Sequence, residues 1–149
     1  MYQKILVPID GSNTSSRGLE EAIKLAKDQR ARIRLIHVVN ELMVATTYEG
    51  TIYTGELIQA VRDGGQKLLD NTKAKVAAAG IEVEAELLEA TGGHAGHTIV
   101  TDAERSQVDL IVLGTHGRRG LSRLLMGSDA EQVVREAKVP VLLVRQPDK

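Results

Sequence analysis

The segment Val108–Gly114, VDLIVLG, is apolar except for Asp109 and ends in a glycine. A short, continuous apolar run of this kind is typical of a central strand in a parallel sheet, where helices cover both faces. The stretch that follows, Gly114–Ala130 (GTHGRRGLSRLLMGSDA), is polar and rich in glycine, so it predicts a loop that leads into a helix. This strand, loop and helix are the βα unit of an α/β protein.

The same alternation extends in both directions along the chain. Four further segments predict strands: Lys4–Ile9, Arg32–Val39, Ile81–Ala90 and Val139–Arg145. Apolar residues at helical spacing predict the intervening helices. These residues are Leu19, Ala22, Ile23 and Ala26; Ile58, Val61, Leu68, Leu69, Thr72, Val76 and Ala79; Ile99, Val100 and Ala103; and Val133, Val134 and Ala137. Ser12 or Asn13 is expected to cap the first helix, and Gly80 to stop the second.

This order predicts one doubly wound α/β domain over residues 1–149, with a five-stranded parallel sheet and helices on both faces. Ile81–Ala90 alternates apolar residues with Glu82, Glu84 and Glu86, as expected of a half-buried edge strand. The last strand is expected at the other edge, where its backbone can pair with a second copy of the chain. That dimer edge comprises Val141, Leu142, Leu143 and Val144. A helix or loop covering the edge is the alternative.

Composition excludes several classes of protein. The net charge is −1 and the chain has no Phe or Trp, which argues against a nucleic-acid-binding protein with a basic surface and stacking platforms. No apolar run approaches the roughly 20 residues that cross a membrane, and no secretory signal is visible. The absence of cysteine fits a reducing compartment, so we expect a cytoplasmic protein without membrane or nucleic-acid partners.

The loop after the fourth strand has the chemistry of a phosphate site. Gly114 and Gly117 allow the backbone to approach an anion closely, and Gly127-Ser128 lies at a helix start, where backbone N–H groups favour negative charge. Asp10 follows the first strand, and it would face this loop if the first and fourth strands are neighbours where the strand order reverses. Positive charge lies nearby at Arg118, Arg119 and Arg123. The loop matches neither the Walker nor the dinucleotide glycine pattern.

The glycine spacing is instead G-x2-G-x9-G-S, from Gly114 through Gly117 to Gly127-Ser128. With Asp10, this spacing resembles the nucleotide-binding branch of the universal stress protein family. The resemblance extends over KILVPIDGS, LIHVV, VDLIVLGTHGRRGL, LLMGS and VPVLLVR, which is nearly the whole chain. It implies a Rossmann-like fold of the adenine nucleotide alpha hydrolase-like type, a homodimer, and binding of ATP, ADP or AMP, with Mg²⁺ accompanying ATP.

The resemblance also implies roles for individual residues. Asp10 is expected at the ribose or base with Pro8 at the pocket floor, and the backbone of Val38 at the adenine edge. Gly127, Ser128 and the backbone of Asp129 are expected at the distal phosphates. The complete expected site is Pro8, Asp10, Val38, Leu113, Gly114, His116, Gly117, Arg118, Gly127, Ser128 and Asp129. One departure is Asp129 itself, because the family often has a small or apolar residue there and a carboxylate repels phosphate.

Several of these residues have structural alternatives. Ser128 and Glu131 form a capping-box pattern, and Asp10 could order the turn before the first helix. The loop arginines could form a solvated surface. His94 and His97 could share one helix face, although a metal site there has no evident third ligand, and His37 is interpreted as a core histidine.

The first functional hypothesis is a nucleotide-binding regulatory protein in which the polar segment Asn40–Gly55 changes its order or its partners with bound nucleotide. A slow ATPase or a nucleotidyl-transfer enzyme is the second, but the sequence offers no evident general base, nucleophile or lysine clamp beside the glycine loop. A nucleotide-free interaction domain is the third. No catalytic residue is assigned, and the protein partner is unspecified.

Overall fold

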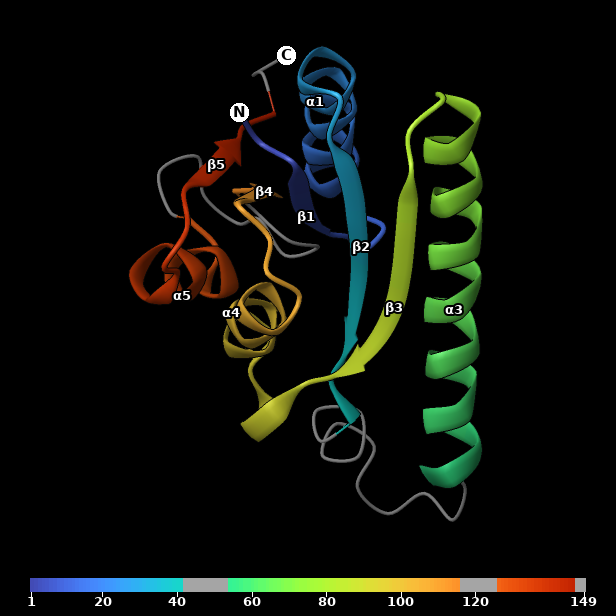
Figure 1. Cartoon of the computed structure of the whole chain (residues 1–149). Coiled ribbons are helices and arrows are strands. Elements are labelled where there is room, and N and C mark those ends of the chain that lie inside the picture. Colours follow the sequence, from blue (N-terminus) through green and yellow to red (C-terminus); the bar gives the residue numbers. More distant parts are fainter. Residues whose placement is uncertain (42–53, 116–125, 147–149) are drawn as a thin grey trace.

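The computed structural model describes residues 1–41, 54–115 and 126–146, in which strands and helices alternate. Their bounds are β1 (Lys4–Pro8), α1 (Asn13–Gln29), β2 (Arg32–Val39), α3 (Thr54–Ala78), β3 (Val83–Glu89), the 3₁₀ turn η1 (Thr91–Gly93), α4 (Ala95–Arg105), β4 (Leu110–Gly114), α5 (Ser128–Glu136) and β5 (Val141–Val144). The five strands form one parallel sheet in the order β3-β2-β1-β4-β5 (Figure 1). The predicted α/β fold is therefore confirmed, and β3 and β5 are the two edges.

Two apolar clusters lie on opposite faces of the sheet. Leu19, Ala22 and Ala26 of α1 and Leu69 and Val76 of α3 pack on one face. Helices α4 and α5 pack on the other through Ile99, Val100, Ala103, Ala130 and Val133. Figure 1 shows the two pairs of helices on either side of the strands. The apolar residues at helical spacing thus predicted the buried side of each helix, because burial repeats with the helical turn, except at Val134 of α5, which is exposed.

Several strands are one or two residues shorter at an end than the predicted segments. Ile81 is only 7% exposed, yet β3 begins at Val83. In front of β4, Asp109 accepts hydrogen bonds from the backbone N–H groups of Gln3 (2.7 Å) and Lys4 (3.1 Å). The one polar residue of VDLIVLG therefore ties the start of β4 to the start of β1.

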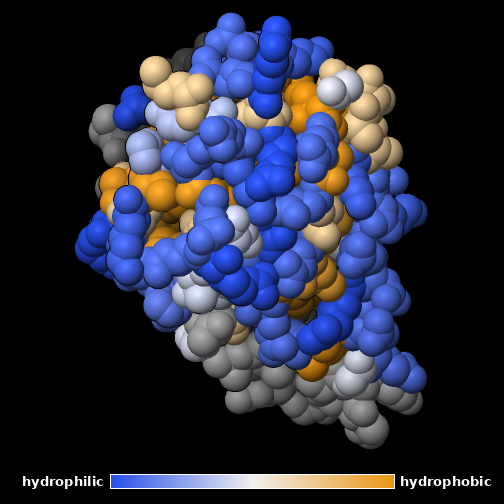
Figure 2. Space-filling model, in the orientation of Figure 1, coloured by the Kyte–Doolittle hydropathy of each residue, from blue (hydrophilic) through white to orange (hydrophobic). Residues whose placement is uncertain are grey.

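The surface in Figure 2 is mostly hydrophilic, with hydrophobic residues visible in separate patches. On α5, Val133 is fully buried whereas Val134 is 45% exposed, because only one side of this helix faces the sheet. None of the helices in the described part of the chain is long and apolar enough to cross a membrane.

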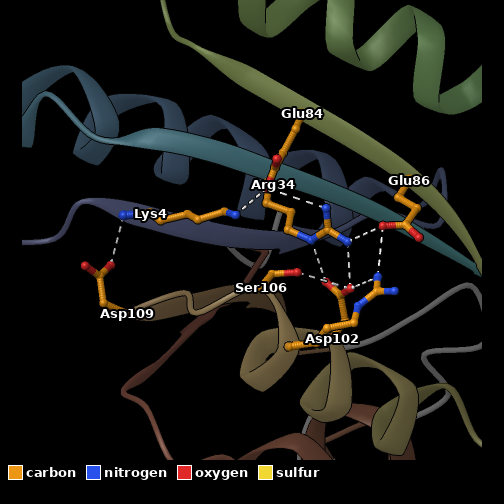
Figure 3. Close-up of polar contacts among 8 residues, drawn as sticks. Lys4, Arg34, Glu84, Glu86, Asp102, Ser106 and Asp109 are labelled. Atoms are coloured by element: carbon orange, nitrogen blue, oxygen red, sulfur yellow. Dashed lines mark hydrogen bonds and ion pairs between the residues drawn. The ribbon is translucent and has the colours of Figure 1, made fainter.

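A buried arginine joins the sheet to α4, and sequence patterns did not predict it. Arg34 of β2 is 6% exposed and Asp102 of α4 is 3% exposed. The guanidinium donates to both carboxylate oxygens of Asp102, from Nε at 2.7 Å and from Nη2 at 2.6 Å (Figure 3). Such a bidentate pair fixes orientation as well as charge. The pair sets the position of α4 on the sheet.

The glutamates of β3 complete this network. Arg34 Nη2 lies 2.5 Å from Glu86, and Lys4 lies 2.5 Å from Glu84, which is the register partner of Arg34 (Figure 3). Arg105 donates to both Glu86 (2.9 Å) and Asp102 (2.7 Å). The predicted row of glutamates does lie at a sheet edge, but Glu84 and Glu86 also pair with Lys4 of β1 and Arg34 of β2. Hydrogen bonds with Asp102 raise the pKa of Arg34 above its ordinary value.

Two adjacent glycines of α3 give a matched test of helix packing. A Cβ atom at Gly65 would lie 2.6 Å from Cδ2 of His37 and 3.0 Å from Cδ1 of Leu87, whereas one at Gly64 would meet nothing within 4 Å. His37 cannot easily withdraw, because its Nδ1 is bonded to the carbonyl of Ile9. We expect Gly65→Ala to lower the free energy of unfolding by about 1–3 kcal/mol, and Gly64→Ala to raise it by about 0.5–1 kcal/mol. Urea unfolding measures both values, and equal effects would contradict this packing.

Candidate functional site

The strand order reverses between β1 and β4, which pair in parallel with Ile5 opposite Leu110. Open α/β sheets bind ligands in the crevice beyond the carboxyl ends of the strands at such a point. Pro8 ends β1 and Asp10 follows it, while Leu113 and Gly114 end β4. The predicted adjacency of the first and fourth strands is confirmed, so these candidate residues belong to one end of the sheet.

Asp10 orders the turn between β1 and α1. Its Oδ1 accepts a hydrogen bond from the backbone N–H of Ser12 at 2.8 Å, and its own N–H donates to Ser15 Oγ at 3.2 Å. Ser12 in turn caps α1 by accepting from the N–H of Ser15 at 3.1 Å. The structural interpretation of Asp10 is thus confirmed, and Ser12 is the expected cap. The turn holds the Asp10 carboxylate at the carboxyl end of β1.

The packing of α1 against β4 leaves no room for a side chain at Gly114. A Cβ atom at this position would lie 2.7 Å from the carbonyl carbon and oxygen of Thr14 in the first turn of α1. A Cβ atom at Gly18, one turn further along α1, would lie 3.3 Å from the Gly114 nitrogen. The two glycines therefore bring α1 against the end of β4. Sequence reasoning missed this role, because the contact joins distant segments.

The two ends of the glycine-rich loop are joined by a hydrogen bond. The N–H of Gly127 donates to the carbonyl of Thr115 at 2.8 Å, and the N–H of Thr115 donates to the carbonyl of Val144 at 3.1 Å. Thr115 is 6% exposed. At Gly127, the last glycine of the G-x2-G-x9-G-S pattern, the chain has therefore returned to the end of β4. Five residues predicted in this loop, His116, Gly117, Arg118, Arg119 and Arg123, lie outside the described residues.

Helix α5 begins without a side-chain cap. Gly127 is its N-cap, with φ −59° and ψ 150°, and the carbonyl of Gly127 accepts the first helical hydrogen bond from Glu131 N–H at 2.9 Å. The capping-box alternative for Ser128 is therefore wrong, because Ser128 already lies within the helix. A helix start of this kind leaves backbone N–H groups and the positive end of the helix dipole available to an anion.

Asp129 is turned toward the neighbouring helix. Its Oδ1 accepts a hydrogen bond from the backbone N–H of Gly96 in α4 at 3.0 Å. The N-cap residue of α4, His94, makes no side-chain capping bond of its own. The sequence GGHAGH carries one signal for this arrangement, since it has no Ser, Thr, Asp or Asn before Ala95 to cap the helix.

Val38 lies near the end of β2, in register with Leu88 of β3, and polar contacts hold the chain that follows. The side chain of Val38 packs with the apolar cluster beneath α4 and α5. Asn40 then donates from Nδ2 to the carbonyl of Gly93 at 2.6 Å. Arg62 of α3 is paired with Glu41. Most of the predicted polar segment, residues 42–53, lies outside the described residues.

The histidines in the described part of the chain are accounted for by protein contacts or exposure. His37 donates from Nδ1 to the carbonyl of Ile9 at 2.7 Å, so its polar group is satisfied as predicted, although the residue is half-buried rather than fully in the core. His97 is exposed, with Nδ1 3.3 Å from Oε2 of Glu136, and His94 is exposed at the start of α4. Within residues 1–41, 54–115 and 126–146, no group of three or more His, Cys, Asp or Glu side chains could hold a metal ion.

Comparison with known proteins agrees with this geometry. The model of the Universal stress protein family matches residues 1–145. The universal stress protein MJ0531 of Methanocaldococcus jannaschii is 38% identical over 151 residues, covering 100% of this chain and 85% of the relative. Universal stress protein YxiE of Bacillus subtilis is also 38% identical, covering 97% of this chain and 100% of the relative.

Solved structures extend the similarity to three dimensions. The structure of the hypothetical protein MJ0577 aligns with a TM-score of 0.86 at 28% identity and covers 100% of this chain and 99% of that one. A universal stress protein of Archaeoglobus fulgidus was solved in complex with dAMP (TM-score 0.67, 23% identity, 96% and 98% covered). Another universal stress protein was solved in complex with cAMP (TM-score 0.66, 23% identity, 97% of each chain covered).

Proposed function

The chain belongs to the universal stress protein family, and we propose that it is a regulatory protein that binds an adenine nucleotide at the carboxyl ends of β1 and β4. The nucleotides in the complexes of its relatives, dAMP and cAMP, are both adenine nucleotides. ATP, ADP and AMP are the ligands that the resemblance to this family implies for this chain.

The observation that carries this proposal is the hydrogen bond from Gly127 to Thr115, at 2.8 Å. It brings the uncapped start of α5 to the end of β4, beside the strand that leads to Asp10. Backbone N–H groups at a helix start suit phosphates, and a carboxylate suits ribose hydroxyls. The protein groups that would bind the phosphates and the ribose of one ligand therefore lie beside two neighbouring strands.

Individual roles are carried over from the family resemblance. We assign Asp10 to the ribose, the backbone of Val38 to the adenine, and the first turn of α5 to the distal phosphates. Pro8, Leu113 and Gly114 line the strand ends between these groups. Mg²⁺ is expected to accompany ATP, because a divalent cation offsets the charge of adjacent phosphates.

The assembly we propose is a homodimer paired through β5. This strand is an edge of the sheet, and its residues Val141–Val144 are all partly exposed. An edge strand presents unpaired backbone groups, and a two-fold axis would let the edges of two copies cover each other.

The direct test is to purify the protein without added nucleotide, denature it, and identify the released small molecules by mass spectrometry. We expect near-stoichiometric adenine nucleotide, or calorimetric binding of ATP with Mg²⁺ if the protein is purified empty. The ratio of ATP to ADP in the released material bears on hydrolysis. Light scattering on the same preparation measures the mass of the assembly. An empty protein that gives no binding heat with ATP or AMP would contradict the proposed function.

A further inference from the structure

Helices α4 and α5 start side by side, and neither start has a side-chain cap from its own N-cap residue. Asp129, in the first turn of α5, supplies one for α4 by accepting from the Gly96 N–H at 3.0 Å. A carboxylate at this place also meets the positive end of the α4 dipole. The backbone N–H groups at the start of α5 have no side-chain cap, while the side chain of Asp129 is bonded to α4.

The contact between the two helix starts is tight. A Cβ atom at Gly96 would lie 2.9 Å from the Asp129 carbonyl oxygen and 2.9 Å from Cβ of Gln132. Along the same helix pair, His97 Nδ1 lies 3.3 Å from Glu136, which also accepts from Gln132 at 3.0 Å. Because backbone meets backbone here, a small shift of one helix start displaces the other.

Resting on the proposed function, we propose that Asp129 is a positioning residue of the nucleotide site. Its bond to Gly96 holds the first turn of α5 in place, so that the N–H groups of this turn meet the distal phosphates. The same bond directs the carboxylate to α4, where its charge is compensated. Held in this way, the Asp129 side chain orients the phosphate-binding turn instead of facing the phosphates.

The experiment compares Asp129→Ala with Asp129→Asn by calorimetric titration of ATP with Mg²⁺ and, separately, of AMP. Asn retains a side-chain oxygen that can accept from Gly96, whereas Ala retains none. We expect Asp129→Ala to lower the affinity for ATP about tenfold and to change that for AMP by no more than about twofold, since AMP lacks distal phosphates. Asp129→Asn is expected to keep the ATP affinity of the wild type.

Glu131→Ala is the matched control. Glu131 is an exposed acidic residue in the same first turn, and its carboxylate lies 4.0 Å from Arg135 of its own helix. Removing it takes away negative charge near the phosphates without touching the contact between α4 and α5. It is expected to leave the ratio of ATP to AMP affinity unchanged or to favour ATP.

Each other outcome is decisive. Higher ATP affinity in both Asp129 variants would show that the carboxylate repels the phosphates, which overturns the inference. An equal loss for ATP and AMP in Asp129→Ala, or no loss at all, overturns it as well. Wild-type protein that binds neither nucleotide refutes the proposed function itself, whereas wild-type binding with an unchanged ratio in Asp129→Ala refutes only the role of Asp129.

Discussion

Replacing Arg34 with methionine is expected to lower the free energy of unfolding by about 3–5 kcal/mol. Methionine fills much of the space of the arginine stem, but it leaves the carboxylate of Asp102 without its bidentate partner. Asp102 is 3% exposed, so water cannot replace the lost hydrogen bonds. Arg105 would still contact Oδ1 of Asp102, but Oδ2 would lose the hydrogen bond from Arg34 Nε. A buried carboxylate that loses a polar partner in this way is among the most destabilising results of a single substitution.

Urea unfolding of wild type and Arg34→Met measures this effect as a shift in the midpoint at constant slope. Arg105→Met is the matched control, because Arg105 contacts the same carboxylate but its side chain is 57% exposed. Its expected cost is no more than about 1 kcal/mol. Similar losses of unfolding free energy in the two variants would mean that the burial of Arg34 does not determine how much its ion pair stabilises the protein.

The effect of Arg34→Met should also depend on pH. Burial by itself would raise the pKa of Asp102, but hydrogen bonds from Arg34 and Arg105 outweigh burial and hold the pKa below its ordinary value. Because the pKa of Asp102 is lowered on folding, its pairing stabilises the folded protein fully at pH values above the unfolded-state pKa of about 3.9. This stabilisation is lost as the pH falls through the folded-state pKa. The difference between wild type and Arg34→Met is therefore largest near neutral pH and shrinks in acid.

Gly127→Val is expected to weaken nucleotide binding by about a hundredfold or more, equivalent to about 2.7 kcal/mol, while the protein remains folded. With φ −59° and ψ 150°, Gly127 has a backbone conformation that valine can adopt. The N–H that donates to Thr115 would be retained. The added side chain would stand where phosphates approach the start of α5, and it would keep them from the backbone donors.

Calorimetry with ATP and Mg²⁺ measures the loss, and circular dichroism with urea unfolding verifies the fold. Gly64→Val is the control for introducing valine at a glycine, because Gly64 lies in α3 with open space around its Cβ position. A folded Gly127→Val variant with unchanged ATP affinity would remove the start of α5 from the proposed site. Gly117→Val, outside the described residues, is expected to act in the same way.

Local patterns were sufficient for the elements of the fold. The continuous apolar run before Gly114 identified β4 as a central strand, and the alternation after Gly80 identified β3 as an edge. These predictions work because burial on one or both faces imposes a period on neighbouring residues, which is visible without knowing what lies opposite. The glycine spacing likewise predicts a loop, since backbone freedom belongs to the residue itself, but residues 116–125 lie outside the described part of the chain.

For the candidate site, the structure bears on where its residues lie and not on what they bind. Asp10 and Gly114 do lie at neighbouring strand ends. Ser128, however, is not the N-cap of α5. The carbonyl that accepts the first helical hydrogen bond belongs to Gly127, one residue earlier. The capping-box pattern requires Ser128 at the N-cap, whereas in the structure Gly127 holds that place and its N–H donates to Thr115.

The sequence by itself determined the alternation of strands and helices, the two sheet edges and the glycine-rich loop, since each depends on residues close together in the chain. Only the tertiary structure decided the partners of charged groups. Arg34 meets Asp102 across 68 residues, and Gly96 meets Asp129 across 33. Such pairs form because the folded chain brings elements that are distant in sequence into contact. In the interior of low polarity, each buried charge or donor then depends on one specific partner.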